Sequence, residues 1–128
     1  MKKGIVIVFN QPLDRQDDGY TLVPVTTESM LDTMYEKIGC RLVQAVHLTD
    51  TIDLICDEEG LYKGYEFGFR FNLKEMKRSG KPNTTQPILG KCVIAKNING
   101  EWTPFSDETE AIEFMYENVI SIDYHIKK

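Results

Sequence analysis

The sequence is poor in cysteine and has no long apolar run, and both deficits narrow the classes of protein to which it can belong. Only three of the 128 residues are cysteines, and they stand far apart at positions 40, 56 and 92. An odd number of widely spaced cysteines does not form a disulfide framework, so we expect reduced thiols in a cytoplasmic protein. The apolar run at residues 5–9 is too short for a signal peptide or a membrane span, so we expect no membrane association.

The sequence also lacks the motifs of common catalytic and cofactor sites. It contains no Gly-x-Ser-x-Gly motif, and Ser29 and Ser106 are better explained as helix caps than as nucleophiles. The two histidines, His47 and His125, and the three cysteines show no metal-ligand spacing. We therefore expect no enzyme activity, no metal and no cofactor.

One histidine and one group of acidic residues could be read as catalytic, but each has a simpler structural explanation. His47 lies in an extended pattern and is expected to point to solvent; as a base it would need a nucleophile that the sequence does not identify. Asp53, Asp57, Glu58 and Glu59 lie close together in the sequence. We interpret these acids as a solvated turn rather than as a paired acid and base.

What the sequence does contain predicts one α+β domain over residues 1–128. We expect a mixed, mainly antiparallel sheet of about five to seven strands with two main helices packed on it. A β-branched strand at 5–9 is expected to be central, and a strand with Pro24 at residues 20–25 is expected at an edge.

Two amphipathic patterns predict the helices. The first spans about residues 29–38, with Ser29 as its cap and a glycine stop at position 39. The second spans about residues 107–118, capped by Ser106. Its inward-facing residues are expected to be Ala111, Ile112, Met115 and Val119.

Aromatic residues occupy every second position from 65 to 71, which is the period of a half-buried strand. The segment approaches the aromatic motif of RNA-recognition domains, where exposed rings stack on bases. The match is partial, because Glu66, Gly68 and Arg70 stand where that motif needs other residue types. We favour the alternative that these rings belong to the core.

Charge is distributed unevenly along the chain. The net charge is −5, which argues against a protein that wraps nucleic acid over its whole surface. Residues 63–81 hold six basic side chains against two acidic ones, a local charge of +4 that leaves −9 for the remainder. Residues 101–123 hold seven acidic side chains and no basic one.

This distribution predicts two candidate binding surfaces. An outward acidic stripe on the second helix is the candidate for partner binding, and its residues are Glu110, Glu113 and Glu117. The basic segment is the candidate for holding a small anionic ligand, and its residues are Arg70, Lys74, Lys77 and Arg78, with Tyr65 stacking on a base. The alternatives, a solvated helix face and a solubilising loop, remain open.

Residues 38–46 and 52–64 resemble an uncharacterised family of small proteins carried by phages, plasmids and prophages of Gram-positive bacteria. The family pattern is a short opening strand, a helix ending in Gly-Gly, a strand with Glu or Gln, and a strand running into a Glu-Glu-Gly turn. An Asn-containing segment, a final Gly-rich strand and an acidic helix follow. The positions that match are Gly39, Gln44, Glu58, Glu59, Gly60, Asn72 and the late strand around Gly90. Cys40 departs from the second glycine, and the aromatic run departs from a usual Leu-Pro step.

The resemblance implies a mobile-element protein in a bacterial cytoplasm, and it supplies no activity. Together with the charge pattern it suggests an accessory protein that binds, and inhibits, a host protein such as a nucleic-acid-handling defence enzyme. The alternative is a small-ligand or nucleotide-binding protein that uses residues 63–81. The sequence leaves the oligomeric state open.

Overall fold

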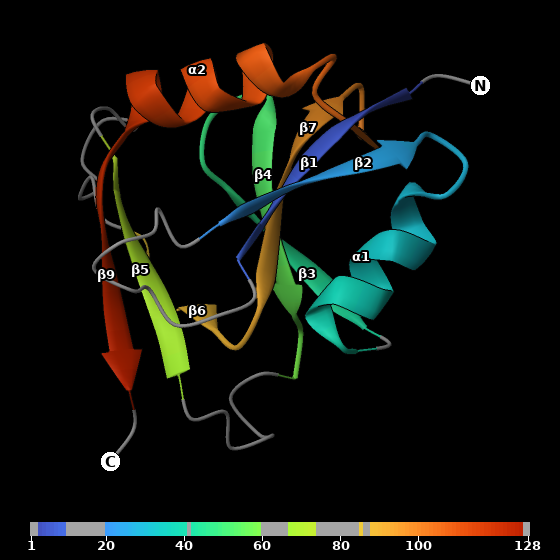
Figure 1. Cartoon of the computed structure of the whole chain (residues 1–128). Coiled ribbons are helices and arrows are strands. Elements are labelled where there is room, and N and C mark those ends of the chain that lie inside the picture. The colour runs from blue at the N-terminus through green and yellow to red at the C-terminus, as the bar shows by residue number, and fades with distance from the viewer. Residues whose placement is uncertain are drawn as a thin grey trace.

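A six-stranded antiparallel sheet forms the centre of the computed structural model, which describes residues 3–9, 20–40, 42–59, 67–73, 85 and 88–126 (Figure 1). Its strand order is β2-β1-β7-β4-β3, with β8 paired to β7. The strands are β1 (Lys3–Phe9), β2 (Thr21–Thr26), β3 (Val43–His47), β4 (Ile52–Asp57), β7 (Cys92–Ile98) and β8 (Glu101–Thr103). As predicted, β1 lies between two neighbours and β2, which carries Pro24, lies at an edge.

A second, three-stranded antiparallel sheet lies on one face of the first. Its order is β6-β5-β9, formed by β6 (Ile88–Leu89), β5 (Phe67–Leu73) and β9 (Val119–Ile126). The helices are α1 (Met30–Ile38) and α2 (Glu108–Asn118), which lie on different sides of the large sheet (Figure 1). The predicted α+β class is therefore confirmed, with the strands divided between two sheets.

The large sheet is covered on both faces, which explains why β1 and β4 are almost continuously apolar. Met30, Met34 and Ile38 of α1 pack with one set of residues that includes Val6 and Val8 of β1. The alternate residues of β1 belong to a second cluster, which includes residues of β5 and α2. Because successive side chains of a strand point to opposite faces, both faces of β1 need apolar residues.

The aromatic strand contributes to the second cluster. Phe69 and Phe71 of β5 are fully buried, and their rings lie 5.7 and 5.1 Å from the ring of Phe9 in edge-on arrangements. The core interpretation is confirmed for these two rings, which leaves neither of them exposed for stacking on bases. Tyr65 lies outside the described residues.

The prediction for α1 is confirmed, with a different role for its cap. Ser29 occupies the N-cap position, but its side chain caps no helix amide. Instead its hydroxyl exchanges hydrogen bonds with Thr26, at 3.0 Å from both the backbone N and Oγ1 of that residue. Gly39 ends the helix with φ 77°, a left-handed conformation that glycine adopts without strain.

Two details predicted for α2 are wrong. Asp107, not Ser106, is the N-cap, and its Oδ1 accepts a hydrogen bond of 2.8 Å from the backbone N–H of Glu110. The buried residues are Ala111, Phe114 and Met115, whereas Ile112 is 47% exposed. The buried face follows the spacing i, i+3, i+4 from Ala111, which places Ile112 one step around the helix.

Among the described residues, no helix is long and apolar enough to cross a membrane.

Candidate functional site

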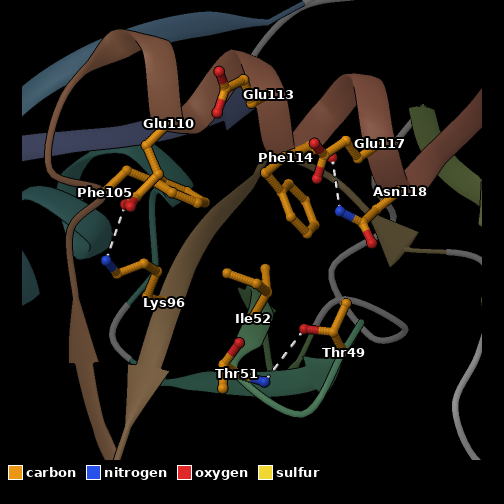
Figure 2. Close-up of a pocket in the computed structure, with 10 residues that line it drawn as sticks. All are labelled: Thr49, Thr51, Ile52, Lys96, Phe105, Glu110, Glu113, Phe114, Glu117 and Asn118. Carbon is orange, nitrogen blue, oxygen red and sulfur yellow. Dashed lines mark hydrogen bonds and ion pairs between the residues drawn. The ribbon is translucent and has the colours of Figure 1, made fainter.

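A cleft of about 340 Å³ opens between α2 and the large sheet, beside the turn that joins β3 to β4 (Figure 2). The turn, the strand β4 that follows it, and β7 form one side, and α2 together with Phe105, which precedes the helix, forms the other. The lining residues are Thr49, Thr51, Ile52, Lys96, Phe105, Glu110, Glu113, Phe114, Glu117 and Asn118.

The charged lining is predominantly acidic. It has three carboxylates, on Glu110, Glu113 and Glu117, and one ammonium group, on Lys96. Lys96 Nζ donates to Glu110 Oε1 at 2.9 Å, and the backbone N–H of Ser106 donates to the same oxygen at 3.0 Å. In the part of the chain that the structure describes, no cation pairs with the other two carboxylates.

The apolar part of the lining consists of Ile52, Phe105 and Phe114, which belong to the second core cluster. The rings of Phe105 and Phe114 lie 5.9 Å apart, so α2 is fixed to the segment that precedes it. Asn118 Nδ2 donates to the carbonyl oxygen of Phe114 at 3.0 Å (Figure 2). The apolar side is thus part of the packed core rather than a mobile surface.

This arrangement suits a cation that carries an apolar stem. The ammonium or guanidinium head would lie between Glu113 and Glu117, and the methylene groups would contact the phenylalanine rings. Among the described residues, the lining holds hydroxyl groups on Thr49 and Thr51 and no cysteine, histidine or serine.

The three acidic residues that the sequence indicated for partner binding therefore lie along one cleft. The side chain of Glu110 is 42% exposed and is paired with Lys96. Glu113 and Glu117 are exposed as expected. The sequence pattern missed the opposite wall, because residues 49–52 and 96 join the cleft only through the pairing of β4 with β7.

Of the predicted ligand-binding residues, only Arg70 lies in the described part of the chain. It belongs to β5, opposite Asp123 of β9 in the ladder, and its Nε atom is buried with no hydrogen-bond acceptor among the described residues. The other four candidates, Lys74, Lys77, Arg78 and Tyr65, lie outside the described residues. The anion-binding surface therefore stays a prediction.

A second polar cluster, which the sequence did not indicate, is centred on Asp53 in β4. This side chain is 1% exposed, so the expectation of a solvated acidic turn is wrong for it, as it is for buried Asp57. Asp53 Oδ1 lies 2.6 Å from Nδ1 of His47, and its Oδ2 accepts hydrogen bonds from Asn97 Nδ2 at 2.8 Å and Trp102 Nε1 at 3.1 Å. A buried carboxylate must be satisfied by donors, and these three residues supply them.

The three cysteines are buried thiols that form no disulfide with one another, as expected for structural thiols. Cys56 and Cys92 are direct partners in the β4–β7 ladder. Burial raises the pKa of the Cys56 thiol, and it raises that of Cys92 well above its usual value. Both groups are thus poor nucleophiles. No group of three or more metal-binding side chains was found among the described residues.

The comparisons with known proteins identify the family of the chain. A family model described as a domain of unknown function, DUF3846, matches residues 15–119. The chain belongs to the DUF3846 family. The comparisons with curated proteins and with solved structures found no match.

The match to DUF3846 includes the whole α2 cleft and the Asp53 cluster, because the residues of both lie between positions 47 and 118. One sequence signal could have revealed the Asp53 cluster. Asp53 interrupts an otherwise apolar strand, and a carboxylate within a buried strand needs hydrogen-bond donors from neighbouring strands. The register that brings those donors together is not visible in the sequence.

Proposed function

We propose that this DUF3846 protein is a binding protein whose α2 cleft holds a positively charged side chain of a protein partner, without a chemical step in the cleft. The proposal rests on one observation: two exposed carboxylates, Glu113 and Glu117, line a cleft that is also lined by three apolar side chains, those of Ile52, Phe105 and Phe114. A lysine or arginine side chain has the matching chemistry, with a charged head and an apolar stem. The described residues of the lining carry a formal charge of −2, from three carboxylates and one ammonium group.

The exposed surface of α2 supports a protein partner rather than a small cation alone. Ile112 and Tyr116 are one helical turn apart on α2 and are 47% and 79% exposed. Tyrosine is enriched in the energetically dominant centres of protein interfaces. An apolar pair beside an acidic cleft is therefore a suitable docking surface for a basic protein segment.

We further propose that the partner is a host protein that handles nucleic acid, and that the chain serves a phage or another mobile element in a bacterial cytoplasm. The resemblance of residues 38–46 and 52–64 to mobile-element proteins supports this assignment. A row of carboxylates can occupy a basic surface that ordinarily holds phosphates. The three buried cysteine thiols agree with a reducing compartment.

A comparison of two charge-matched double variants tests the cleft. E113Q/E117Q removes two carboxylates from the cleft, while E36Q/E101Q removes two exposed carboxylates from α1 and β8. We expect the first variant to weaken binding of a fluorescein-labelled Arg-Ser repeat peptide by roughly three- to tenfold, and the second to leave it nearly unchanged.

Equal weakening by both double variants would mean that the peptide responds to the overall charge of the protein. It would refute the proposal that the peptide binds in the cleft. A bacterial protein captured from host lysate tests the finer assignment in the same way. Its capture must be lost in E113Q/E117Q and retained in E36Q/E101Q, and it must be a nucleic-acid-handling protein.

A further inference from the structure

The hydrogen bonds of Asp53 fix which nitrogen of His47 carries the proton. An ionised carboxylate can only accept hydrogen bonds, so the 2.6 Å contact at Oδ1 requires a proton on Nδ1 of His47. Nε2 is then the unprotonated nitrogen of the neutral ring. The His47 side chain is 73% exposed, so this nitrogen is accessible from solvent.

The two carboxylate oxygens of Asp53 have different partners. Asn97 and Trp102 donate to Oδ2 and hold the carboxylate in place, while Oδ1 contacts His47. His47 itself lies on β3, the last strand of the large sheet, and adds little buried surface. The result is an exposed imidazole held by a buried carboxylate that is itself held by two donors. In hydrolases with a Ser-His-Asp triad, a buried carboxylate holds the catalytic histidine in the correct tautomer and orientation in this way.

We propose that His47 forms a second functional site, separate from the α2 cleft, at which Nε2 accepts an acyl group from a small neutral ester. The nitrogen attacks the carbonyl carbon, an N–C bond forms, and the C–O bond breaks as the alkoxide or phenolate leaves with the electron pair. Water then cleaves the acyl-imidazole, releasing the carboxylate and protons and restoring the neutral ring. Asp53 stabilises the positive charge that develops on the ring.

The surroundings favour a neutral substrate over an anionic one. The negative charge of Asp53 lies directly behind the ring, so it disfavours phosphoryl donors, which are anionic. Ala45 and Val43 on the same face of β3, together with partly buried Trp102, add apolar surface beside the imidazole. A small ester with an apolar leaving group fits this environment.

Asp53→Asn makes a sharp spectroscopic test, because the two donors at Oδ2 dictate how the new amide is oriented. Its oxygen must face Asn97 and Trp102, so its NH₂ group faces His47 and donates to Nδ1. The proton of the neutral ring then moves to Nε2. In ¹⁵N NMR spectra of the neutral ring, we expect the Nδ1–H tautomer in the wild type and the Nε2–H tautomer in D53N. A wild-type ring with the proton on Nε2, or evenly divided, would overturn the proposal.

Hydrolysis of p-nitrophenyl acetate, followed by release of p-nitrophenolate, tests the reactivity. His47→Gln changes an exposed side chain and is expected to abolish most of the rate, while D53N lowers it at least roughly tenfold by presenting the wrong tautomer. His125→Gln is the matched control and keeps the wild-type rate. If H47Q hydrolyses the ester as fast as the wild type, the site does not exist, whether or not D53N folds.

Discussion

Lys96 Nζ lies 2.9 Å from Oε1 of Glu110, and this contact joins β7 to α2 across the cleft. Lys96 is the only cation among the described residues of the cleft lining, and it repels a positive group that enters. Its side chain is 20% exposed and that of Glu110 is 42% exposed, which makes the pair partly screened by solvent.

Replacing Lys96 with Met should therefore strengthen the binding of a basic peptide. The variant removes the repulsion and keeps an apolar stem of similar length. We expect the affinity for the labelled Arg-Ser peptide, measured by fluorescence anisotropy, to rise roughly two- to fivefold, since such a charge interaction is worth about 0.2–1 kcal/mol. Weaker binding would mean that Lys96 contacts the ligand as a donor, which would make the cleft a site for anions.

Asp107→Ala should destabilise the protein through the loss of the α2 cap. The Asp107 carboxylate accepts from the backbone N–H of Glu110, and replacement of such a cap costs about 0.5–2 kcal/mol in the free energy of unfolding. Ser106→Ala is the matched control, because only the backbone N–H of Ser106 takes part in the contact with Glu110. Urea unfolding should separate the two variants; equal losses would show that the cap is assigned to the wrong residue.

Gly68→Ala should also destabilise the protein, because a Cβ at this position would lie 2.7 Å from the carbonyl oxygen of Ile88. Gly68 pairs with Leu89 in the β5–β6 ladder, so the backbones would have to separate. Overpacking of this kind costs about 1–3 kcal/mol. Thermal unfolding measures the loss, and an unchanged midpoint would contradict the close approach of β5 and β6.

Alkaline pH should weaken the fold through the buried thiols. Burial raises the pKa of Cys56 and, more strongly, of Cys92, whereas the unfolded thiols ionise near their ordinary pKa of about 8.5. Above that pH the unfolded chain binds fewer protons than the folded chain, so the free energy of unfolding falls as pH rises. Urea unfolding at a series of pH values from 7 to about 10 measures the slope.

Cys92→Ala provides the control for this pH dependence. The variant is less stable at every pH because it leaves a cavity in the core, but it lacks the more strongly shifted thiol. Its free energy of unfolding should therefore decline less steeply above the thiol pKa than that of the wild type. Identical slopes would mean that other groups cause the alkaline loss.

The sequence predicted the elements well where one pattern dominated. The β-branched strand β1 and the helix α1 with its Gly39 stop agree with the structure because burial, period and end signals coincide there. The face of α2 was ambiguous, since Ile112 and Tyr116 form a second apolar row beside the true buried row of Ala111, Phe114 and Met115. Helical period alone does not tell which row meets the core.

The candidate sites depended on contacts between distant segments. The acidic row on α2 was visible in the sequence, but Thr49, Ile52 and Lys96 reach it only after the large sheet has formed. The Asp53 cluster likewise joins side chains from β3, β4, β7 and β8. Strand register determines which of these side chains lie next to one another. A one-residue change of register would move every side chain of a strand to the opposite face of the sheet.

An NMR titration of the ¹⁵N-labelled protein with the Arg-Ser peptide shows whether the α2 cleft holds a basic side chain. We predict saturable shifts of backbone amides that line the cleft, at Thr51, Lys96 and residues 110–118, and no such shifts in E113Q/E117Q. Saturable shifts confined to other surfaces, or shifts that persist in that variant, would show that the peptide does not bind in the cleft.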